Sequence, residues 1–207
     1  LLKAQMHPEI LFASLEKIQL LAQRNETDKA SILLLKLADI LSYILYECDK
    51  AFVPLEKEIK IIKDYLVLQK TNMGNRLEMD IAVKGEPGNK MIAPLLLFTL
   101  IENCFAYIDN TNLDQNWINL EFQVEDTELT LKMIHGKTED SSARPGGVGE
   151  LASVIRNLDF YYPGNYELNR TIEPEIRMIY LKIITGGHMS KRNNIQNISE
   201  QITYATA

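Results

Sequence analysis

Residues 92–107, IAPLLLFTLIENCFAY, are apolar almost throughout and contain one adjacent pair of strongly polar side chains, Glu102 and Asn103. A helix that is apolar on nearly every face is buried in the interior of a domain. A carboxylate and an amide in such a helix need hydrogen-bonding partners, because burial of an unpaired polar group costs free energy. The stretch therefore predicts a buried central helix that carries a single polar site.

Three helices are predicted upstream of this stretch, at residues 1–24, 28–48 and 54–72. In the first and third, apolar side chains recur at intervals of four, three and four residues, which places them on one helical face. These side chains are Leu11, Leu15, Ile18 and Ala22 in the first helix and Leu55, Ile59, Ile62 and Leu66 in the third. Pro54 starts the third helix, at a position that tolerates its missing N–H.

After Gly74 the sequence alternates between apolar and polar residues, as is typical of strands. Strands are predicted at residues 76–83, 117–125, 128–135, 166–170 and 177–184, with a hairpin turn at 125–127, a loop at 136–149 and a short helix at 151–160. The predicted fold class is therefore α+β. A helical hairpin region (1–74) precedes an α/β sandwich domain (75–185) and a tail without periodicity (186–207).

The composition restricts the partners and the compartment. The net charge of −6 argues against direct nucleic-acid binding, because phosphate contacts need a surplus of Lys and Arg. Cys48 and Cys104 lie in separate apolar helical patterns and are expected to be buried free thiols in a reducing compartment. Residues 31–48 have the length of a membrane span, but three charged side chains interrupt them, which favours a buried bundle helix. Because the chain begins at Leu1 without Met, we expect a fragment, with any membrane segment upstream.

Five motifs occur in a recognisable order along residues 1–185. They are LKAQMHPEILFASL (2–15), LADILSYIL (37–45), VPLEKEIKIIKDYLVLQ (53–69), PLLLFTLIEN (94–103) and GGVGELASVIRNLDFYYPG (146–164). This order resembles the cytoplasmic transmitter of LytS/YehU-type sensor histidine kinases. The third and fifth motifs together carry most of the resemblance.

The resemblance implies a fold, a cofactor and partners. The N-terminal helices would pair with a second copy as a homodimer, and the C-terminal domain would have the GHKL-type ATP-binding fold. Mg-ATP would donate its γ-phosphate to a histidine on the first helix, and an aspartate of a response regulator, often of the LytTR type, would then take it. The chain would be the cytoplasmic portion of an inner-membrane protein, in contact with the membrane only through an upstream segment.

The phosphate acceptor is altered in this chain. The family usually has Pro-His-Phe on the first helix, whereas this sequence has Pro8, Glu9 and Ile10. A neutral imidazole is nucleophilic near pH 7, but a carboxylate is a poor nucleophile and repels phosphate. His7 is the alternative acceptor, although two residues along a helix rotate a side chain by about 200°. The family residues at three further helical positions are also missing; Ala13, Ser42 and Asn72 stand there.

The nucleotide site is kept only in part. By resemblance, Asn103 would hold Mg²⁺ through its side-chain oxygen, and Glu102 would polarise a water or the acceptor. His135 stands where the family has an Asp or Asn that accepts a hydrogen bond from the adenine amino group. Gly147 and Gly149 match the glycine-rich lid, whose backbone N–H groups face phosphates at a helix start.

Other positions of that site are changed. Glu150 is an insertion after the glycines, and its carboxylate competes with phosphate for the helix N-terminus. Ala106 and Tyr107 replace a basic residue and a histidine of the family, and Ser153 and Asn157 stand where it often has Asn and Arg. The residues that shape the fold are kept, whereas many that carry the chemistry have changed.

Three functions are consistent with this pattern. The leading hypothesis is a degenerate histidine kinase-like transmitter with weak or absent autophosphorylation, which acts through dimer and partner contacts. The second is an active ATP-dependent histidine kinase that uses His7 and phosphorylates a response regulator. The third is a nucleotide-sensing dimerisation module without phosphoryl transfer, in which Asn103 binds Mg-nucleotide.

Overall fold

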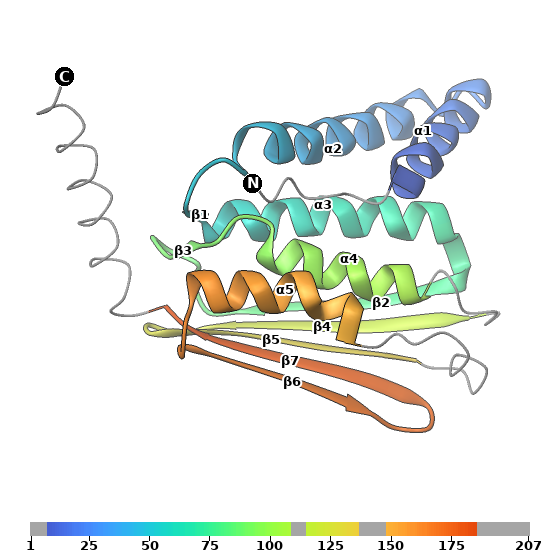
Figure 1. Ribbon diagram of the computed structural model, residues 1–207. Coiled ribbons are helices and arrows are strands. Elements are labelled where there is room, and N and C mark those ends of the chain that lie inside the picture. Colours follow the sequence, from blue (N-terminus) through green and yellow to red (C-terminus); the bar gives the residue numbers. More distant parts are fainter. Residues whose placement is uncertain (1–7, 109–114, 137–147, 186–207) are drawn as a thin grey trace, which may run out of the picture.

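The computed structural model describes residues 8–108, 115–136 and 148–185 (Figure 1). Its helices form layers over one face of a five-stranded sheet. The helices α4 (Leu96–Ile108) and α5 (Val148–Tyr161) lie over the sheet, whereas α1 (Pro8–Gln23) and α2 (Thr27–Tyr46) lie farther from it (Figure 1). This arrangement confirms the predicted α+β class with helices at the N-terminus.

The helix α2 packs against both α1 and α3 through one apolar face. Its buried side chains recur at intervals of three and four residues, as the amphipathic pattern requires. They are Ala30, Leu33, Leu37, Ile40 and Tyr43. Within the described part of the chain, no helix has the length and apolarity that crossing a bilayer demands, and α2 is a bundle helix, as expected.

The helix α3 (Leu55–Met73) connects the hairpin to the α/β part, because it contacts both α2 and α4. It begins one residue after the predicted start, since Pro54 is its N-cap and also pairs with Met91. That pairing joins the short strands β1 (Val53–Pro54) and β3 (Met91–Ile92) in an antiparallel ladder. The turn η1 (Gly74–Arg76) then ends the helix and leads into the sheet.

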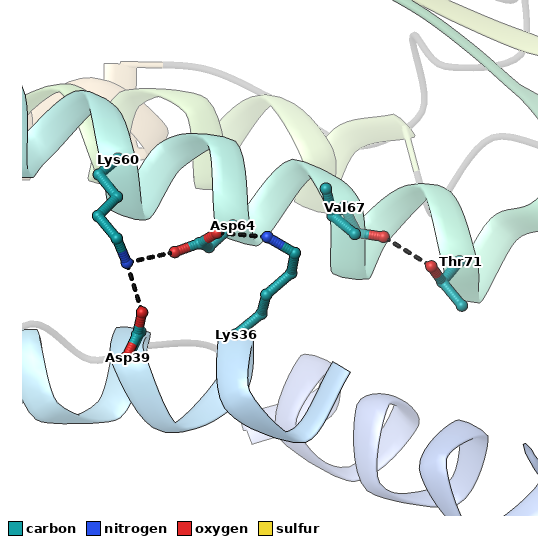
Figure 2. Close-up of polar contacts among 6 residues, drawn as sticks. All are labelled: Lys36, Asp39, Lys60, Asp64, Val67 and Thr71. Atoms are coloured by element: carbon teal, nitrogen blue, oxygen red, sulfur yellow. Dashed lines mark hydrogen bonds and ion pairs between the residues drawn. The ribbon is translucent and has the colours of Figure 1, made fainter. Parts of the chain in front are cut away.

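Ion pairs fix α2 against α3 (Figure 2). The ammonium of Lys36 lies 2.7 Å from one oxygen of Asp64, and that of Lys60 lies 3.0 Å from the other. Lys60 also contacts Asp39 of α2, so the two helices are bridged twice (Figure 2). Farther along α3, the Thr71 hydroxyl donates to the carbonyl of Val67 at 2.8 Å.

The two aspartates of this network differ in burial, and we expect them to differ in their effect on stability. The side chain of Asp64 is 9% exposed and that of Asp39 is 54% exposed. Asp64→Ala is expected to lower the free energy of unfolding by about 1–3 kcal/mol, because it leaves a half-buried ammonium without its acceptor. Asp39→Ala should cost less than about 1 kcal/mol. Urea denaturation of both variants checks this, and equal losses would contradict it.

The sheet is mixed, with the strand order β2-β4-β5-β7-β6. The strands are β2 (Leu77–Lys84), β4 (Asn116–Val124), β5 (Glu128–Gly136), β6 (Tyr166–Ile172) and β7 (Ile176–Ile184). Only the β2–β4 pair is parallel. Along β4, β5 and β7 alternate side chains point into the core, as the period of a strand requires. The hairpin turn predicted between β4 and β5 is present, and the N–H of Glu125 donates to the carbonyl of Glu128.

Two expectations from the sequence need correction. The central helix was predicted to start at residue 92, but α4 starts at Leu96, because β3 and a turn containing Pro94 and Leu95 precede it. Leu95 has a φ of 59°, a left-handed conformation that a helix does not contain. Both cysteines are free, as expected, but Cys48 is only half-buried whereas Cys104 is buried.

Candidate functional site

The polar pair of α4 lies where the helix faces the interior. Glu102 is buried and Asn103 is half-buried. Both side chains belong to residues that have interaction partners within the protein. The prediction that the buried carboxylate and amide need hydrogen-bonding partners stays a prediction.

Asn103 lines a small cavity between α4 and the sheet. The cavity has a volume of about 20 Å³ and is lined by Asn103, Cys104, Tyr107, His135, Leu151, Arg170, Arg177 and Ile179. It brings together two of the predicted site residues, Asn103 of α4 and His135 of β5, which are far apart in the sequence. Glu102 does not line it.

The remaining predicted site residues are only partly described. His7 and Gly147 lie outside the described residues. Glu9 is in the first turn of α1, and Gly149 is in the first turn of α5. Gly149 is two residues before Leu151, whose side chain lines the cavity.

His135 is buried in a definite protonation state. Its Nδ1 lies 2.9 Å from the carbonyl oxygen of Gly136, and because a carbonyl only accepts, Nδ1 carries the proton. Burial lowers the pKa of His135, and the positive charge of Arg177 lowers it further, against the opposing effect of the Gly136 hydrogen bond. His135 is therefore neutral near pH 7, with Nε2 as an acceptor. An acceptor is what the adenine contact requires.

Tyr107 occupies the space beside this acceptor. Its ring lies against the His135 ring, with 5.3 Å between the centroids and 52° between the planes. The Arg177 guanidinium stacks over Tyr107, with Cζ 3.7 Å from the ring centroid. The three side chains come from α4, β5 and β7 and pack as one group.

Sequence reasoning missed Arg177. It is the first inward-facing residue of β7, and the other inward positions of that strand are Ile179, Leu181 and Ile183. The alternation of the strand was a sufficient signal, because an arginine in an apolar row is buried and needs a partner. Tyr107 was noted as a departure from the family, but its packing against Arg177 depends on the tertiary fold.

The cavity beside Asn103 and His135 is small. A volume of about 20 Å³ suits roughly one water, whereas small-molecule pockets usually measure about 300–1,000 Å³. Asn103 offers one amide oxygen to a metal ion. No group of three or more His, Cys, Asp or Glu side chains that could hold a metal occurs in residues 8–108, 115–136 and 148–185. The described residues that line this cavity therefore leave space for about one water between them.

A second buried polar group, absent from the sequence-based predictions, lies at the start of α4. Glu58 of α3 is fully buried, and its carboxylate accepts from the Tyr43 hydroxyl of α2 at 2.5 Å. It also accepts from the backbone N–H groups of Leu95 at 3.0 Å and Phe98 at 3.1 Å. Burial raises the pKa of Glu58, and these hydrogen bonds act against that effect. One carboxylate thus joins α2, α3 and α4.

The start of α4 is held from the other side as well. The N–H of Ala93 donates to the Tyr162 hydroxyl at 2.8 Å. Tyr162 follows α5 directly, and Phe52 packs edge-on against it. The helix that carries Asn103 is therefore positioned by both the helical hairpin and α5.

Known proteins resemble this chain in sequence. Residues 1–77 match the family model described as histidine kinase. The Sensor protein LytS of Bacillus cereus is 28% identical over 51% of this chain and 18% of its own length. The Sensor histidine kinase/phosphatase LytS of Staphylococcus aureus is 26% identical over 84% of this chain and 31% of its own length. The predicted resemblance is confirmed: the chain is similar in sequence to LytS-type sensor histidine kinases. It spans less than a third of the length of these two relatives.

Solved structures give a weaker likeness. The histidine kinase AdeS of Acinetobacter baumannii is 10% identical over 80% of this chain and 83% of that one, with a TM-score of 0.48. A score at this level supports no correspondence between individual residues.

Proposed function

We propose that this relative of the LytS-type sensor histidine kinases is a degenerate transmitter of a two-component system. In this proposal it passes a signal through contacts between chains, with weak or absent autophosphorylation. The observation that carries the proposal is the packing of Tyr107 against both His135 and Arg177, in a cavity that has space for about one water. The replacement of the acceptor histidine by Glu9 supports the same conclusion.

The proposed contacts between chains involve the helical hairpin. The helices α1 and α2 expose eight large apolar side chains, and a surface of this kind on a small domain marks an interaction site. These side chains are Phe12, Leu15, Leu20, Ile32, Leu34, Leu35, Leu45 and Tyr46. The proposed partners are a second copy of this chain and a response regulator. The proposed regulators include those of the LytTR type. The proposed location is the cytoplasmic portion of a membrane protein.

Nucleotide binding is the direct test of this proposal. We expect millimolar Mg-ATP or Mg-ADP to leave the thermal unfolding midpoint of the purified chain unchanged, because the base has no room beside His135. A nucleotide at about 100 times its dissociation constant would instead add about 2.7 kcal/mol to the free energy of unfolding. Differential scanning calorimetry with and without nucleotide measures this.

Asn103→Ala is the control that locates any binding. A Mg-dependent rise of the unfolding midpoint that disappears in Asn103→Ala would show that the site on α4 binds nucleotide. That result would overturn the proposal and favour a nucleotide-sensing module or an active kinase.

A further inference from the structure

The cavity beside α4 contains a buried positive charge. Arg177 is 8% exposed, and its Nε has no hydrogen-bond partner. Within the part of the chain that the structure describes, no carboxylate forms an ion pair with it. The Tyr107 ring offers a cation–π contact, worth up to about 2 kcal/mol when desolvated, whereas burial of an uncompensated charge costs several kcal/mol. Among the described residues, the arginine therefore has no counter-charge.

A second donor without a partner lines the same cavity. The Tyr107 hydroxyl is buried and makes no hydrogen bond. Among the described residues no carboxylate lines the cavity. His135 is neutral and adds no charge. The described lining therefore holds one buried arginine without a partner carboxylate and two donors without a partner, the Arg177 Nε and the Tyr107 Oη.

The size of the cavity limits what that acceptor is. A volume of about 20 Å³ is slightly more than the roughly 10–15 Å³ that a single water needs. A water would accept from both donors but would leave the arginine charge uncompensated. A monatomic anion accepts from both donors and also neutralises the charge. We propose that this cavity binds a single small inorganic anion of the size of chloride, held by Arg177 and Tyr107.

This proposal is independent of the transmitter function. It requires neither nucleotide nor phosphoryl transfer, and its test contains neither. If the chain were found to bind Mg-ATP, the proposed function would fail, whereas the response to chloride would remain to be measured by itself.

The test compares sodium chloride with sodium gluconate at equal ionic strength. We expect chloride to raise the thermal unfolding midpoint of the wild-type chain, and at about 100 times its dissociation constant to reduce the unfolding equilibrium constant about 100-fold. Arg177→Met should abolish this difference between the two salts, and Tyr107→Phe should reduce it. Lys182→Met is the matched control on the same strand, because Lys182 pairs with Glu128 and does not line the cavity.

Two results would overturn the proposal. One is a chloride response of equal size in the wild type, in Tyr107→Phe and in Lys182→Met, which would place the effect elsewhere on the molecule. Tyr107→Phe keeps the test valid if Arg177→Met does not fold, since it removes only a hydroxyl. The second contradicting result would come from crystals grown in sodium bromide. It is a cavity that contains a water and shows no anomalous bromide peak.

Discussion

Replacing Glu58 with alanine is expected to lower the free energy of unfolding by about 3–5 kcal/mol. The carboxylate accepts from the Tyr43 hydroxyl and from the N–H groups of Leu95 and Phe98, and all three donors lie in the interior. Its removal leaves them without an acceptor, and each buried donor left unsatisfied costs about 1–3 kcal/mol. It also removes the support for the left-handed backbone at Leu95, where α4 begins.

Urea denaturation at pH 7 measures this loss, with Glu56→Ala as the matched control. Glu56 lies two residues before Glu58 on the same helix and is exposed, so its replacement should change stability by less than about 0.5 kcal/mol. The loss of unfolding free energy in Tyr43→Phe should lie between the losses in Glu56→Ala and Glu58→Ala. This substitution removes one donor and leaves the carboxylate hydrogen-bonded to α4. If Glu58→Ala unfolds at the same urea concentration as Glu56→Ala, Glu58 does not join the three helices in solution.

Replacing Gly85 with alanine is expected to cost about 2–4 kcal/mol, for two reasons that add. Gly85 has a φ of 83°, which L-residues rarely adopt. A Cβ built on it would also lie 2.1 Å from the carbonyl oxygen of Val124, so the end of β4 would have to move. Because this oxygen belongs to the backbone, no side-chain rotation relieves the clash.

Gly164→Ala separates the two contributions. Gly164 has a φ of 70°, and a Cβ there meets nothing within 4 Å. Gly164→Ala should therefore lower the free energy of unfolding only by the cost of the left-handed backbone, about 1–2 kcal/mol. Equal unfolding free energies for the two variants would contradict the steric account of Gly85. Chemical denaturation of both proteins, followed by circular dichroism, distinguishes these outcomes.

The elements that the sequence predicted well are those with a regular pattern. Leu33, Leu37 and Ile40 follow a helical period, and the strands β4, β5 and β7 alternate between buried and more exposed side chains, so burial on one face specifies both. The predicted start of α4 was wrong, because an apolar run has no periodicity that marks where the helix begins. Pro94 and Leu95 end the preceding strand by their backbone conformation, and the N–H groups that follow are held by Glu58, which is distant in sequence.

The candidate site was predictable only in part, for a related reason. Asn103 and His135 were identified from the resemblance, and the fold brings both to one cavity. The role of Tyr107 depends on which side chain faces it from β7, and a single sequence does not show that Arg177 does so. A motif identifies the residues of a site, whereas the room left between them depends on how the elements pack.

The most direct test of the proposed loss of kinase activity is phosphate incorporation from Mg-ATP labelled at the γ-position, for the wild type and for Glu9→His. We expect no acid-labile label in either protein, because restoring the acceptor does not make room for the base beside Tyr107. Label on the wild type that disappears in His7→Ala would show an active kinase with a displaced acceptor. Label on Glu9→His alone would show that the chain binds ATP and lacks only its acceptor. The first result would contradict the proposal of weak or absent autophosphorylation, and the second would contradict the expectation that the chain does not bind nucleotide.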